Sequence, residues 1–132
     1  MKKTNRIIAL VLSLVLCMSC AITAYADSDV ATAGKYGSVR GTLTYSGSAF
    51  TAVTRVSQND GTGKLYTTLA LYSASSVHLG TKTNSSSYGS VSLTTNYAGG
   101  SIYGETLNYA QCCHEVRNAS GGYACYTLEY VN

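Results

Sequence analysis

The residues of this chain that could do chemistry gather near its C-terminal end. Cys112, Cys113 and His114 are consecutive, and Cys125 follows within the next segment. Thiolates and imidazoles serve as catalytic nucleophiles and bases, and they also bind zinc. Either chemistry needs the side chains to converge on one point. The backbone that carries these residues therefore decides what they can do.

This C-terminal segment is predicted to be a β-hairpin, because two alternating runs flank the turn sequence at 118–122. Side chains alternate between the two faces of a strand, so Cys112 and His114 share the apolar face while Cys113 lies on the polar one. The adjacent cysteines therefore cannot easily share a metal ion. No Asp or Asn is placed to orient His114 as a base. We predict no catalytic residue, no metal and no cofactor here.

A disulfide is the expected role of the hairpin cysteines. A three-residue loop at 118–120 would place Cys113 directly opposite Cys125 on the polar face and would turn Tyr126 inward. Directly opposite Cα atoms lie about 4.5–5.5 Å apart, within disulfide range. We therefore predict a Cys113–Cys125 disulfide with Cys112 as a buried free thiol. A zinc site, a vicinal Cys112–Cys113 disulfide and an intermolecular disulfide are the alternatives.

The N-terminal segment is typical of a secretory signal peptide. Three basic residues precede an apolar run, and Ala24 and Ala26 fit the small-x-small cleavage rule. We interpret residues 1–26 as the signal and expect the mature chain to begin at Asp27. A membrane anchor and lipidation at Cys20 are weaker interpretations. The protein is expected to be secreted and extracellular, with association to the cell surface as an option.

Removal of the signal changes the charge of the chain. From residue 27 onward there are six Lys or Arg and six Asp or Glu, so the formal net charge falls from +3 to zero. No basic patch remains to attract nucleic acid. A net charge near zero also permits self-association, because copies repel one another little.

The rest of the chain has the period-two pattern of an all-β protein. Residues 27–37 carry little pattern and are predicted to be a flexible lead-in, and residues 38–132 to be a single domain. About seven strands with turn signals between them indicate a small antiparallel β-sandwich. The predicted strands begin near Val39, Phe50, Leu65, Val77, Val91, Ile102 and Tyr123.

Tyrosines on strand faces favour a binding function. Tyr66 and Tyr72 lie opposite the leucine face of their strand, where exposed rings could contact a partner. We therefore predict a non-enzymatic binding module at the bacterial cell surface, with cell-wall glycan or a protein surface as partner. In general architecture the chain resembles small exported β-sandwich proteins of Gram-positive bacteria, some of which are bacteriocins. A secreted bacteriocin-like toxin and a small secreted hydrolase are the alternatives.

Overall fold

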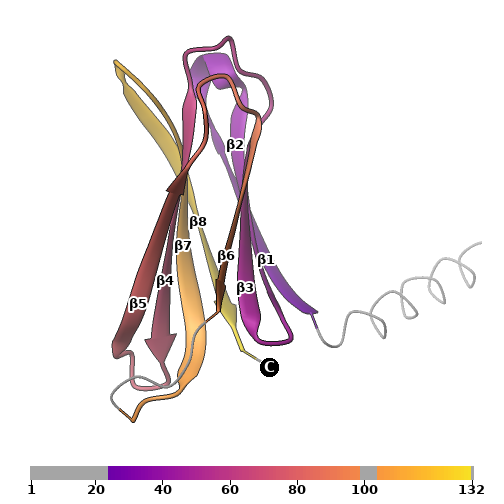
Figure 1. Cartoon of the computed structure of the whole chain (residues 1–132). Helices are drawn as coiled ribbons and strands as arrows, with labels where there is room; N and C mark the ends of the chain where they lie inside the picture. Colours follow the sequence, from indigo (N-terminus) through magenta and orange to yellow (C-terminus); the bar gives the residue numbers. More distant parts are fainter. Residues whose placement is uncertain (1–23, 99–103, 132) are drawn as a thin grey trace, which may run out of the picture.

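The protein is a sandwich of two antiparallel four-stranded sheets that face each other (Figure 1). The computed structural model describes residues 24–98 and 104–131. Sheet A has the strand order β1-β2-β3-β6, and sheet B has the order β5-β4-β7-β8. The elements are β1 (Ala24–Thr32), the 3-10 helix η1 (Gly34–Tyr36), β2 (Ser38–Ser46), β3 (Ala49–Val56), β4 (Lys64–Ser73), β5 (His78–Ser85), β6 (Ser92–Ala98), β7 (Leu107–Asn118) and β8 (Gly121–Tyr130). The predicted all-β sandwich is confirmed, with one strand more than the sequence pattern indicates.

The additional strand is β1, where a flexible lead-in over 27–37 was predicted. The structure corrects this prediction, because most of that segment forms β1 and η1. The inward side of this strand carries two carboxylates, Asp27 and Asp29, and no apolar pattern that would mark a strand in the sequence. Asp27 accepts a hydrogen bond from the Leu128 amide at 2.9 Å, and Asp29 accepts one from the Tyr126 amide at 3.1 Å. These two bonds close the outer edge of β8, and they explain why hydrophobic periodicity missed β1.

The predicted signal peptide lies almost wholly outside the described residues. Only its last three residues, 24–26, belong to β1, so cleavage before Asp27 stays a prediction. Within residues 24–98 and 104–131, no helix has the length and apolar character needed to cross a membrane.

The core between the sheets consists of two apolar clusters. Strand alternation sends one face of each strand inward, and β4 shows this in strict alternation of buried and half-buried residues. The first cluster contains Leu43, Phe50, Ala52, Leu69, Leu71, Leu79, Ala110 and Cys112. The second contains Ala33, Tyr36, Val39, Val56, Leu65, Val116 and Cys125. The strands place a layer of buried polar side chains between the two clusters.

His114 on β7 is the centre of this polar layer, and its imidazole is fully buried. Its Nδ1 lies 2.8 Å from Oγ1 of Thr54 on β3, in the opposite sheet. Its Nε2 lies 2.8 Å from Oγ1 of Thr127 on β8. Thr54 in turn bonds the hydroxyl of Thr67 on β4 at 2.7 Å. Both ring nitrogens are thus satisfied, and no buried side-chain oxygen or nitrogen of the described residues lacks a partner.

The position opposite this imidazole must be glycine. A Cβ built on Gly41 of β2 would lie 2.0 Å from Cδ2 of His114, closer than atoms can approach. The ring therefore occupies the volume that a side chain on β2 would fill. This close approach fixes how β2 and β7 pack across the sandwich.

The C-terminal hairpin has a register one residue away from the predicted one. Asn118 pairs with Gly121 across a two-residue loop, whereas three loop residues were predicted. The Asn118 side chain accepts a hydrogen bond from the Ser120 amide at 2.8 Å, which favours this tight turn. A shift by one residue exchanges the two faces of a strand. Thr127 is therefore buried, whereas Tyr126 faces solvent.

Burial lowers the pKa of His114 to about 4, although Asp29 and Asp27 partly oppose this. In the unfolded chain the pKa is about 6.5. Between these values the unfolded state binds more protons, so stability falls as the pH is lowered. We expect the free energy of unfolding contributed by this group to be constant above about pH 7 and to fall by about 3 kcal/mol towards pH 4. Urea unfolding across this pH range measures the effect.

His114→Gln should be less stable at neutral pH and should lose most of this pH dependence, because glutamine does not titrate. His78→Gln is the matched control, since His78 is exposed and its Nε2 lies 2.6 Å from Oγ1 of Thr81. Equal pH dependence in the wild type and His114→Gln would show that another group is responsible.

The observed register also predicts which thiols react. Cys113 is half-buried on the outer face, whereas Cys112 and Cys125 are only 2% and 1% exposed. We expect an alkylating reagent to modify Cys113 alone in the folded protein. Reaction should be slow at neutral pH, because burial and Glu115 raise the pKa of Cys113 to about 11. Mass-spectrometric mapping with one reagent before unfolding and a second one after it would measure this. Modification of Cys125 at the rate of Cys113 would contradict the register.

Candidate functional site

The three hairpin cysteines do not form the predicted disulfide. Cys113 pairs with Tyr126 and not with Cys125, which pairs with His114 on the inner face. Cys113 and Cys125 thus point to opposite faces of sheet B, and Cys112, Cys113 and Cys125 are all free. The prediction failed because it assumed the three-residue loop. The described residues also hold no group of three His, Cys, Asp or Glu side chains that could bind a metal ion.

Cys112 and His114 share the inner face, as predicted, but they are poorly arranged for nucleophilic catalysis. The sulfur lies 3.9 Å from Nδ1 of His114, and Thr54 already occupies that nitrogen at 2.8 Å. Burial raises the pKa of Cys112 to about 12, so the thiolate is strongly disfavoured. A nucleophile needs a lowered pKa or a free base beside it. Cys112 and His114 are therefore packing residues of the core.

The two outer faces of the sandwich differ sharply in chemistry. The outer face of sheet A carries threonines, arginines and asparagine, as in the Thr51–Asn96 hydrogen bond at 2.7 Å. The outer face of sheet B carries tyrosines from three of its strands. Aromatic side chains are enriched where proteins meet partners. The outer face of sheet B is therefore the candidate functional site.

One end of this face holds a row of aromatic rings. Cross-strand pairing aligns His78, Tyr72, Tyr109 and Tyr130 on β5, β4, β7 and β8. The rings of Tyr72 and Tyr109 stack with centroids 5.1 Å apart and an interplanar angle of 15°. His78 and Tyr130 flank this pair, each with its ring centroid 5.5 Å from the neighbouring tyrosine. The two middle rings of the row, Tyr72 and Tyr109, therefore pack their flat faces against neighbouring rings.

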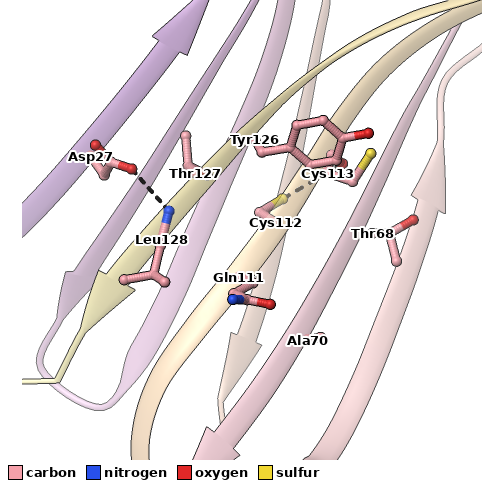
Figure 2. A pocket seen from close by; sticks show the side chains of 9 residues that line it. All are labelled: Asp27, Thr68, Ala70, Gln111, Cys112, Cys113, Tyr126, Thr127 and Leu128. Carbon is pink, nitrogen blue, oxygen red and sulfur yellow. Dashed lines mark hydrogen bonds between the residues drawn. The ribbon is translucent and has the colours of Figure 1, made fainter.

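Next to this row the face is hollowed, with a volume of about 460 Å³ (Figure 2). On β4 the small residues Thr68 and Ala70 stand between two tyrosines, so the surface dips between them. Gln111 and Leu128 line one end of the hollow, and Cys113 lies at the other beside Tyr126.

Tyr126 is the most exposed large side chain at this hollow, with 66% of its surface accessible. Its ring lies beside the Cys113 side chain, directly across the β7–β8 pair (Figure 2). Asp29 fixes the backbone of Tyr126, and this hydrogen bond lowers the pKa of the carboxyl group. The exposed ring thus stands on a well-anchored strand.

The structure places the two tyrosines singled out in the sequence on this outer face, but it does not bring them together. Tyr72 belongs to the aromatic row, whereas Tyr66 lies towards the hairpin end of β4, and both are half-buried. The sequence analysis missed Tyr126 because the wrong register turned it inward. The spacing of Tyr66, Thr68, Ala70 and Tyr72 was the signal that could have located the hollow.

No protein-family model matches the chain, and no curated protein sequence is similar to it. A solved structure of an endonuclease/exonuclease/phosphatase from Beutenbergia cavernae is similar, with a TM-score of 0.45 and 16% identity over 81% of this chain. The chain spans 27% of that protein.

This match contradicts the function predicted from the sequence, a non-enzymatic binding module at the cell surface. The protein with the similar fold is named for nuclease and phosphatase activities, and the prediction of a non-enzymatic binding module is withdrawn. At this identity and TM-score the likeness supplies no function of its own.

Proposed function

We propose that this protein is an assembly subunit that associates with a second copy of itself through the outer face of sheet B. The observation that carries the proposal is the position of Tyr126, an exposed knob at the rim of a hollow on the same face. A two-fold interface uses the same patch on both subunits, so each patch must offer both a knob and a hole. In such a dimer the Tyr126 of each copy fills the hollow of the other.

The charge distribution supports a second copy as the partner. Among the residues that line the hollow, those on β4, β7 and β8 are uncharged, and the only carboxylate is Asp27 at the β8 edge. Two such faces can meet without opposing like charges in their centre. From residue 27 onward the chain is also formally neutral, so copies repel one another little.

The size of the face suits a stable dimer. Four strands spaced ~4.8 Å apart and about ten residues long give a projected area of roughly 600 Å², near the ~800 Å² per partner of a standard interface. Contact through the outer edge of β8 is disfavoured, because Asp27 and Asp29 already occupy its Leu128 and Tyr126 amides.

A flat sugar is a poorer fit to this face. Sugars stack on exposed ring faces, but Tyr72 and Tyr109 direct their faces at each other and at their neighbours. The aromatic row and the hollow together favour a protein surface as the partner. We also propose that assembly follows export, because the N-terminal sequence is typical of a secretory signal peptide. That the chain is not an enzyme stays a prediction.

Tyr126→Arg tests the proposal by placing a charge where the knob should be buried. We expect the wild type to dimerise in sedimentation velocity as its concentration rises. The variant should weaken the dimer by about 2 kcal/mol, or about thirtyfold in Kd. A thiol reductant should be present throughout, so that a disulfide through Cys113 cannot mimic assembly.

Val30→Arg is the matched control, because Val30 is 51% exposed on β1, away from this face. It should dimerise like the wild type. A wild type that stays monomeric at all concentrations would overturn the proposal. Equal weakening by Tyr126→Arg and Val30→Arg would also count against it, since the contact would then lie elsewhere.

A further inference from the structure

A second cavity lies at the hairpin end of the molecule, and positive charge gathers at it. Its volume is about 510 Å³, within the range of small-ligand pockets. Lys35, Tyr66, Tyr88 and Arg117 line its walls, and the β7–β8 turn closes one side with Ser120. None of these residues lines the hollow that Tyr126 is proposed to fill.

Two cations lie side by side at the edge of this cavity, because Arg117 lines it and Lys64 lies beside two of its lining tyrosines. Lys64 and Arg117 are directly opposite in the β4–β7 register, and like charges so placed repel. Both approach the Tyr66 ring, with Arg117 Cζ at 4.5 Å and Lys64 Nζ at 5.8 Å from its centroid. Lys64 Nζ also lies 5.5 Å from the centroid of Tyr88. Two tyrosine rings thus hold Lys64 in place.

Arg117 is oriented in advance of any ligand. Glu115 accepts hydrogen bonds from its Nε at 2.6 Å and its Nη2 at 2.9 Å, while Tyr66 lies under the guanidinium. Five N–H groups belong to a guanidinium, so three donors remain for a ligand. A fixed guanidinium loses little entropy when it binds an oxyanion.

The carboxylates at this end do not neutralise all of its cations. Lys35 pairs with Asp60 at 3.1 Å, and Arg117 pairs with Glu115. Lys64 has no carboxylate partner among the residues that the structure describes. The positive charge of Lys64, beside the cavity wall formed by Tyr66 and Tyr88, is therefore uncompensated.

Two polar residues that line the cavity, Thr62 and Asn118, are hydrogen-bonded to a buried tyrosine. The hydroxyl of buried Tyr36 lies 2.9 Å from Thr62 Oγ1 and accepts a hydrogen bond from Asn118 Nδ2 at 2.9 Å. These bonds tie η1, the β3–β4 loop and β7 together beneath the cavity. Thr62 and Asn118 are therefore held in place without a ligand.

We propose that this cavity binds an organic oxyanion, with the charged group on Lys64 and Arg117 and a flat ring beside Tyr88. The cavity is far larger than an inorganic ion, so the anionic group must be carried on a larger body. Tyr88 is 66% exposed and offers a flat surface for that body. This proposal does not depend on self-association.

Calorimetric titration at low salt with phenyl phosphate, inorganic phosphate and phenol tests the proposal. Phenyl phosphate should bind at least about tenfold more tightly than either fragment. Lys64→Gln should weaken its binding about tenfold or more, because a charged hydrogen-bond donor is lost.

Arg55→Gln is the matched control, because Arg55 also faces a like charge, Arg40, but on the outer face of sheet A, and neither lines this cavity. Its affinity for phenyl phosphate should equal that of the wild type. Equal affinity in Lys64→Gln and the wild type would overturn the proposal, as would no binding of phenyl phosphate. Inorganic phosphate that binds as tightly as phenyl phosphate would overturn the assignment of the ring. Each result is independent of the oligomeric state measured by sedimentation.

Discussion

The imidazole of His114 is the constraint on which the rest of the sandwich depends. A buried imidazole needs a partner for each nitrogen, and here the partners come from opposite sheets, Thr54 in one and Thr127 in the other. Its bulk also requires glycine at position 41. One side chain therefore sets the spacing of the sheets, their relative position and the face that β8 turns inward.

The choice of inner face on β8 also decides its outer surface. With Thr127 turned towards His114, the neighbouring Tyr126 must point to solvent. The same orientation directs the backbone N–H groups of Tyr126 and Leu128 towards the free edge of β8. There they donate hydrogen bonds to Asp29 and Asp27, respectively. Burial of one polar ring thus connects the core to the edge of the sheet and to the exposed tyrosine on its face.

Alternation along the chain was enough to predict the sandwich and the strands from β2 onward, because their inward faces are apolar. It was also enough to place Cys112 and His114 inward. It could not predict the hairpin register, since the tight turn depends on one hydrogen bond from the Ser120 amide to Asn118. It missed β1 because Asp27 and Asp29 there each bond a backbone amide of β8 and add no apolar face.

The β4–β7 pair shows how one ladder can separate different surface chemistries. Its pairs run from stacked Tyr72 and Tyr109 at one end to Lys64 and Arg117 at the other. Apolar contact gains from burial and is weakened by fixed charge, so an interface and an anion site on one face must stand apart. The small residues of β4 between these ends leave the centre of the face uncharged and recessed, so the charged pair stays at the hairpin end.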